Sequence, residues 1–160
     1  MPENAPNPAA RQILLQRIYL KDASVEVPLA PQVFTRQLNP QLDVQVGTAT
    51  APLGNSVYQV MLTVTVTAKL GEETGFLVEV HQAGVFQMVG FAAESDIQAV
   101  LAGYCPGVIF PFAREAVADL IQRTGFPPML LQPINFEALY AEHQARSREQ
   151  GAAGSGIVLQ

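Results

Sequence analysis

The sequence is poor in the side chains that enzymes and metal proteins use. Its 160 residues include no tryptophan, one cysteine and two histidines, and charged residues make up only 14% of the chain. A typical soluble domain is about 25% charged. Hydrophobic residues, by contrast, make up 49%. Such a composition in a chain of single-domain length predicts an oligomer or an apolar binding surface, because exposed apolar area needs cover.

Few residues are candidates for a metal or catalytic site. Cys105 is the only cysteine, which excludes a disulfide within the chain and argues against a cysteine zinc site. His81 and His143 have no further ligand at metal-binding spacing, and no segment matches the glycine-rich loops that hold phosphates. The neighbouring carboxylates of Glu72 and Glu73 fall in a predicted turn, where exposure to solvent explains them better than general acid–base catalysis. Cys105 itself lies in an apolar stretch, which favours a buried side chain over a nucleophile, so we expect no cofactor and no metal.

The charge of the chain limits the classes of partner that we expect it to bind. The net charge is −5 with a pI near 4.9, and the nine lysines and arginines never form a run, which argues against nucleic acid. The first residues lack the basic and apolar regions of a signal peptide, and no run of about 18 apolar residues is present to span a bilayer. We therefore expect a cytoplasmic protein without direct membrane insertion.

Alternating apolar and polar residues predict four strands, near residues 15–27, 42–46, 58–67 and 76–81. The proline-rich segment 28–40 between the first two is long enough for a crossover. Turn-forming residues are dense at 51–56 and again at 71–75. Strands joined by such short turns must be antiparallel.

The apolar period then changes to that of helices. Ser95 and Gln98 have the spacing of a capping box, which predicts a short helix ending at Gly103. A second helix follows and is stopped by Gly125. Asn135 is placed to cap a last helix. Strands followed by helices predict an α+β fold: a four-stranded antiparallel sheet, Greek-key-like, with helices packed on one face.

Composition also divides the chain into parts. Residues 1–12 are rich in proline and asparagine and predict a disordered tail. Residues 13–146 form the single predicted domain. Residues 147–160 contain several glycines and predict a flexible tail.

Two sets of residues are candidates for binding. The period of two places Asp22 and Glu26 of the first strand on one face, and Leu77 and Glu79 of the fourth on the corresponding face; a solvated sheet face would also explain them. Aromatic residues gather after the fourth strand. They either fill the core or, with the proline-bounded loops 28–40 and 126–133, line an apolar groove for extended chains.

Seven segments carry a family resemblance, in the family's order along the chain. They are QRIYLKD at 16–22, APQVF at 30–34, VTVTA at 64–68, LGEETGFLVEV at 70–80, GYCP at 103–106, FPFARE at 110–115 and PINF at 133–136. Together they resemble the bacterial protein-export chaperone family SecB. The LGEE-T and YCP…FP-AR blocks are the most specific. Family members often have tryptophan near the position of Leu38.

The resemblance implies an assembly and two interaction sites. It implies a homotetramer, a dimer of dimers that joins sheets edge to edge with the helices between them. It implies that the SecA ATPase docks on the open sheet face through Asp22, Glu26, Leu77 and Glu79. It also implies a groove for unfolded chains, for which the candidate contacts are Phe34, Leu38, Tyr104, Phe112, Phe136 and Tyr140.

These observations favour a protein that is not an enzyme. The leading hypothesis is an ATP-independent holdase that binds unfolded secretory precursors and delivers them to SecA. A sheet-based interaction scaffold with one folded partner is an alternative. A small enzyme that depends on Cys105 is another.

Overall fold

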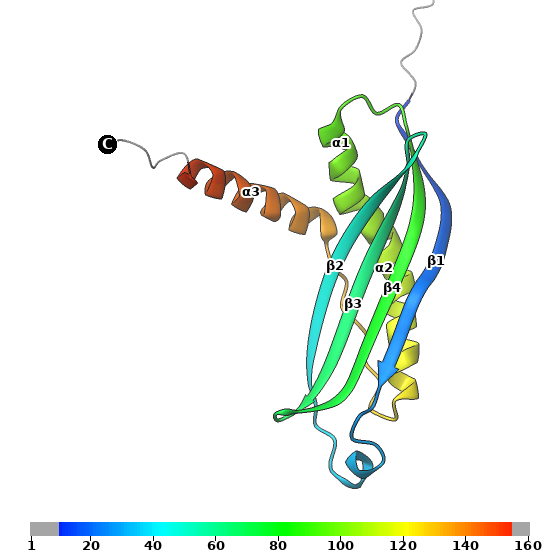
Figure 1. Ribbon diagram of the computed structural model, residues 1–160, viewed down its shortest axis with the longest axis vertical. Helices are drawn as coiled ribbons and strands as arrows, with labels where there is room; N and C mark the ends of the chain where they lie inside the picture. The colour runs from blue at the N-terminus through cyan, green and yellow to red at the C-terminus, as the bar shows by residue number, and fades with distance from the viewer. Residues whose placement is uncertain (1–9, 155–160) are drawn as a thin grey trace, which may run out of the picture.

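A four-stranded antiparallel sheet forms the frame of the computed structural model, which describes residues 10–154 (Figure 1). Its strands are β1 (Gln12–Glu26), β2 (Gln41–Gly54), β3 (Val57–Leu70) and β4 (Glu73–Val89). The order across the sheet is β1-β4-β3-β2. Successive hairpins link β2, β3 and β4, whereas a crossover containing the short 3-10 helix η1 (Gln32–Thr35) carries the chain from β1 to β2. The predicted α+β, Greek-key-like fold is confirmed.

The strands are longer than the alternation predicted. On the inner face of β4, the apolar positions give way after Val80 to Gln82 and Gly84, so the sequence pattern ends while the strand continues to Val89. β2 likewise runs through residues 51–54, where a turn was predicted. Pro52 fits there because β2 is an edge strand, with a neighbour on one side only.

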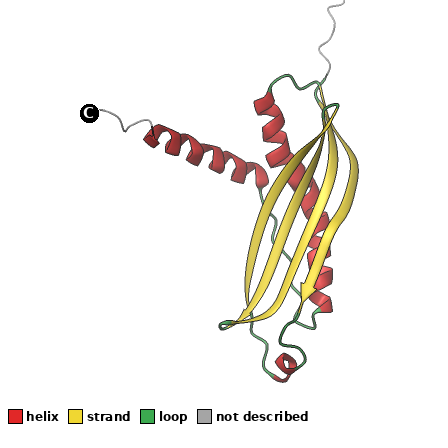
Figure 2. Ribbon diagram, in the orientation of Figure 1, coloured by secondary structure: helices red, strands yellow, loops and turns green. Residues whose placement is uncertain are grey.

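The helices form a second layer on one face of the sheet (Figure 2). α1 (Glu94–Ala99), the π-helical turn η2 (Val100–Tyr104) and α2 (Cys105–Arg123) make one continuous run. The predicted helix end at Gly103 is therefore wrong. Gly103 is buried inside η2, where a Cβ would lie 3.0 Å from Cγ of Glu137. Its glycine permits a close approach between helices and does not end one.

The start of α1 also differs from the prediction. Ser95 lies inside the helix, and Ala93 at the N-cap has no side-chain hydrogen bond. The capping box is therefore not formed. Instead, the Gln98 amide donates to the Glu94 carboxylate at 2.9 Å, an (i, i+4) contact on the helix surface.

The core lies between α2 and the two central strands. α2 packs against β3 and β4, and the inner-face valines and leucines of β3 are fully buried there. By length and composition alone, the helical run Glu94–Arg123 is also long and apolar enough to cross a membrane, a property that core helices share. In this fold its apolar side, including Ile109 and Val117, is part of the core.

The last helix, α3 (Phe136–Gly154), projects away from the sheet and packs mainly against η2 (Figure 1). The backbone N–H of Ala138 donates to Oδ1 of Asn135 at 3.0 Å, which confirms the predicted cap. Residues 147–154 are helical where a flexible tail was predicted, because alanine, glutamate, arginine and glutamine favour helices. Residues 1–9 and 155–160 of the predicted tails lie outside the described residues.

The end of α2 provides a test of the fold. Gly125 has φ +83°, and a Cβ there would lie 3.0 Å from the ring of Phe34. Left-handed backbone costs an L-residue about 1–2 kcal/mol, so Gly125→Ala should lower the unfolding temperature at fixed chain concentration. Gly107→Ala is the matched control, because Gly107 lies in α2 with no atom within 4 Å of its Cβ position. It should leave stability unchanged or raise it. Equal unfolding temperatures for the two variants would contradict this explanation of the helix end.

Candidate functional site

The sheet brings together the four residues predicted to form a docking surface. β1 and β4 are neighbours, and their register sets Glu26 opposite Leu77 and Ser24 opposite Glu79. Asp22 lies opposite His81, one pair further along. Asp22, Glu26, Leu77 and Glu79, which we call the outer-face patch, therefore lie side by side on the face away from α2. Their role in docking stays a prediction.

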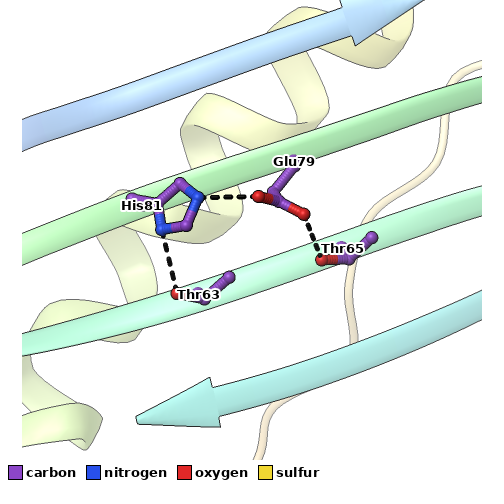
Figure 3. A network of polar contacts seen from close by, with 4 residues as sticks. All are labelled: Thr63, Thr65, Glu79 and His81. Atoms are coloured by element: carbon purple, nitrogen blue, oxygen red, sulfur yellow. Dashed lines mark hydrogen bonds and ion pairs between the residues drawn. The ribbon is translucent and has the colours of Figure 1, made fainter. Parts of the chain in front are cut away.

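A chain of polar contacts fixes Glu79 within this patch (Figure 3). One carboxylate oxygen lies 2.7 Å from Nε2 of His81, and the other accepts a hydrogen bond of 3.1 Å from the Thr65 hydroxyl. Nδ1 of His81 in turn lies 3.0 Å from the hydroxyl oxygen of Thr63. These four side chains come from β3 and β4 alone, so the two central strands position the carboxylate.

These contacts keep Glu79 ionised. The hydrogen bond from His81, followed by that from Thr65 and the charge of His81, lowers the pKa of the Glu79 carboxyl below its ordinary value, and partial burial opposes them. The side chain is still 40% exposed. The centre of the outer-face patch is therefore a carboxylate that is charged, oriented and reachable by solvent.

Asp22 and Glu26, the other two acids of the patch, are also free to contact a partner. Among residues 10–154, no ion pair involves Asp22 or Glu26. Both are exposed on the edge strand β1. With Leu77 half-buried between them and β3, the patch has an acidic rim around an apolar contact, which suits a basic partner segment.

The residues predicted to line one groove lie in different parts of the fold. Tyr104 and Phe136 line a pocket of about 460 Å³ where η2 meets α3, and Tyr104 and Tyr140 line a neighbouring one of about 350 Å³. Phe136 is itself buried, with its ring 5.8 Å from that of Phe110, so it is largely a core residue. Phe112 is exposed on α2 and does not line these pockets.

The other two predicted groove residues belong to the crossover. The ring of Phe34 packs edge-on against Phe126 at 5.9 Å, and Phe126 packs against Phe76 at 5.2 Å. Leu38 is half-buried and packs against the core. Phe34 lies in η1, which Figure 1 shows at one end of the sheet. It is thus anchored through Phe126 while the residue remains 44% exposed.

An apolar surface along the inner face of β2 runs between these two places. The loop 126–133 and Tyr140, which were predicted to line a groove, do border it, whereas the contribution of β2 was not predicted. One pocket of about 370 Å³ lies between Val44 and residues 129–134. Another, of about 560 Å³, lies between Val46 and α3, including Leu139 and Tyr140. Leu130 is 64% exposed and Leu139 51%. We call this surface the β2 groove; it is defined by Val44, Val46, residues 129–134, Leu139 and Tyr140.

The alternation of β2 did contain part of this signal. Leu42, Val44 and Val46 alternate with Asp43 and Gln45, as expected of a half-buried strand, and the register with β3 places the three apolar residues on the inner face. The sequence did not indicate that α2 packs mainly over β3 and β4. Because α2 does not extend over β2, Leu42 and Val44 stay exposed, and Val46 lines a pocket while it packs against the edge of the core.

Catalytic chemistry at Cys105 is not supported by its surroundings. The side chain is fully buried, and burial raises the pKa of the thiol to about 12. At neutral pH it is therefore a protonated, inaccessible thiol. In residues 10–154, no three histidine, cysteine or carboxylate side chains gather to hold a metal ion.

The polar chain at Glu79 predicts a measurable pKa change. Thr65→Val removes one hydrogen-bond donor from the carboxylate but keeps a β-branched strand residue, so the pKa of Glu79 should rise toward its ordinary value. Because the folded-state pKa is lowered, the stability that these contacts contribute is present above the unfolded pKa and is lost as pH falls through the folded one. Wild type should therefore exceed Thr65→Val in stability at neutral pH, and the difference should shrink on acidification.

Carboxyl NMR titration checks this directly. The control is Thr67→Val on the same face of β3, because the Thr67 hydroxyl makes no hydrogen bond to any described residue. An unchanged Glu79 pKa in Thr65→Val, or the same shift in both variants, would show that the Thr65 contact does not stabilise the carboxylate.

A structural comparison agrees with the fold. The Rv1957 SecB-like chaperone of Mycobacterium tuberculosis, solved in complex with a ChAD peptide from the HigA1 antitoxin, is similar with a TM-score of 0.61 and 19% sequence identity. The match covers 76% of this chain and 87% of that one. At this identity it shows a shared fold.

Sequence comparisons show the family as well as the fold. The family model described as preprotein translocase subunit SecB matches residues 6–147. The protein-export protein SecB of Nitrosococcus oceani is 47% identical over 144 residues, which cover 89% of this chain and 87% of the relative. That of Chromobacterium violaceum is 50% identical, covering 87% and 92%. The resemblance predicted from the motifs is confirmed: this chain belongs to the SecB family.

Proposed function

We propose that this protein is a cytoplasmic, ATP-independent holdase of protein export, which binds unfolded preproteins along the β2 groove and delivers them to the SecA motor. Its membership of the SecB family supports the role in export. The observation that carries the binding function is the uncovered apolar face of β2.

The shape and chemistry of the β2 groove suit an unfolded chain. Its pockets of about 370 and 560 Å³ are open to solvent and mostly apolar, so they can accept the apolar side chains of an extended segment that lies along β2. Apolar contact contributes about 25 cal/mol per Å² buried and is not directional. Such a surface accepts many sequences, provided that the client exposes apolar side chains, which folded proteins do rarely.

The peptide-bound SecB-like chaperone of Mycobacterium tuberculosis gives independent support, since a protein of this fold binds a peptide. A scaffold for one folded partner would instead need fixed polar contacts to select that partner. The β2 groove has few, which favours the general binder.

We further propose a homotetramer built as a dimer of dimers. β1 is a sheet edge, and Leu15, Leu20 and Val25 on its inner face remain exposed. Edge strands of this kind favour pairing with another chain. A second sheet placed over the helices would cover the exposed leucines and Phe112 of α2.

The outer-face patch supports docking of SecA. In a tetramer with its helices inside, the face that carries Asp22, Glu26, Leu77 and Glu79 stays outside. Charge attraction to a basic segment would speed the encounter, and Leu77 would add a desolvated contact. Client binding and motor docking would then use opposite faces of one sheet and could occur together.

Client binding is tested by making the β2 groove polar. Leu130→Ser with Leu139→Ser should weaken suppression of aggregation of an unfolded precursor by roughly thirtyfold or more, because each exposed leucine loses about 1–2 kcal/mol of apolar contact. Both side chains are mostly exposed, so folding should be preserved. The matched control is Leu53→Ser, 57% exposed at the far end of β2. A double variant as active as the control would place the client elsewhere.

Motor docking is tested by reversing charge in the patch. Glu79→Lys should strongly weaken binding to SecA at low salt, measured by calorimetric titration, and wild-type affinity should itself fall as ionic strength rises. Glu72→Lys makes the same change of charge at the β3–β4 hairpin and should have a small effect. Client binding should persist in both. Unchanged affinity of Glu79→Lys at low salt would refute docking on this face.

A further inference from the structure

We propose that His81 is a positioning residue of the outer-face patch that makes SecA docking depend on pH: a neutral imidazole holds Glu79 ready for a cationic partner, and an imidazolium becomes that carboxylate's own counter-ion and weakens docking. This inference rests on the proposed docking function. It adds a residue and a form of regulation that the four patch residues do not provide.

The hydrogen-bond chain determines which ring nitrogen carries the proton. A carboxylate only accepts hydrogen bonds, so Nε2, 2.7 Å from Glu79, must be the N–H donor. In the neutral ring, Nδ1 is then an acceptor, and the Thr63 hydroxyl, 3.0 Å away, donates to it. A hydroxyl both donates and accepts. When the ring gains its second proton on Nδ1, the Thr63 oxygen accepts that bond with no movement of heavy atoms.

The site therefore accommodates both charge states of the ring. Histidine is the side chain that gains or loses a proton between about pH 5 and 8. His81 is 24% exposed, so protons reach it. Protonation therefore adds a positive charge to His81 beside the Glu79 carboxylate and leaves the geometry of the hydrogen-bond chain unchanged.

The surroundings of His81 on the outer face are acidic. β1 contributes Asp22, directly opposite in the register, with Lys21 beside it at an irregularity of the strand. β4 contributes Glu79. β3 contributes only the hydroxyls of Thr63 and Thr65, which do not titrate in this range. One strand further, β2 has Gly47 level with Thr63, and its acid on this face, Asp43, lies level with Leu77. α2 lies on the opposite face.

Protonation acts against the partner in two ways. The patch gains a positive charge at the end where His81 lies beside Asp22 and Glu79, so its attraction for a basic segment falls. The Glu79 carboxylate also gains a charged partner at 2.7 Å, which an incoming lysine or arginine must displace. Docking should therefore be tighter when the imidazole is neutral and weaker when it is an imidazolium.

Two substitutions separate this mechanism from a structural role. His81→Gln keeps a hydrogen-bond donor next to Glu79 but cannot gain charge. His81→Lys places a permanent cation there. SecA affinity would be measured by calorimetric titration at pH 8.0 and pH 5.8 for wild type and both variants, with client binding as the control for intact protein.

Wild type should lose about threefold more affinity than His81→Gln between the two pH values, the size expected for one partly exposed charge pair. His81→Lys should be weak at both. Any titration within SecA affects all three proteins equally and cancels in the comparison. Parallel pH profiles for wild type and His81→Gln would overturn the role of His81 while leaving docking intact. No loss of SecA affinity in Glu79→Gln at pH 8.0 would overturn the docking surface itself.

Discussion

A single helix is too narrow to cover this sheet, and the functions proposed for the protein follow from that mismatch. An α-helix with its side chains is about 10 Å wide, and neighbouring strands lie about 4.8 Å apart, so one helix covers about two strands. Here α2 covers β3 and β4. The inner faces of β1 and β2 keep exposed apolar side chains, among them Leu20 and Val44.

The two edge strands that α2 leaves uncovered, β1 and β2, favour different kinds of contact. On β1, apolar residues next to an open strand edge favour assembly with another copy of the chain. On β2, the returning segment 126–135 and α3 line the exposed strip without filling it, which leaves pockets for client side chains. The outer face of the same sheet is polar, and its central strands hold Glu79 and His81 in fixed positions. In the functions that we propose, one thin sheet thus offers separate surfaces for assembly, client and motor.

The sequence predicted what depends on local pattern. Strict alternation identified β3 and the first half of β4, and it placed Leu77 and Glu79 on one face. Asn135 and Gly125 marked a helix start and a helix end through their backbone chemistry. The family motifs identified the protein's relatives.

Features that depend on packing between distant segments were missed. A glycine such as Gly103 is typical of a helix end, but here it allows Glu137 of α3 to approach closely. The aromatic ring of Phe136 suggested a binding residue, but it is buried against Phe110. Leu130 and Leu139 are ordinary leucines in sequence, and only the path of the chain beside β2 exposes them. The Thr63–His81 contact likewise requires the register between β3 and β4.

The central claim is that the uncovered strands serve assembly and client binding at once. Native mass spectrometry with and without a reduced, unfolded secretory precursor tests it most directly. We expect the mass of four chains, shifted by bound precursor when the precursor is unfolded and unshifted when it is folded. A monomer that binds neither form, or an assembly that binds folded and unfolded precursor equally, would contradict the claim.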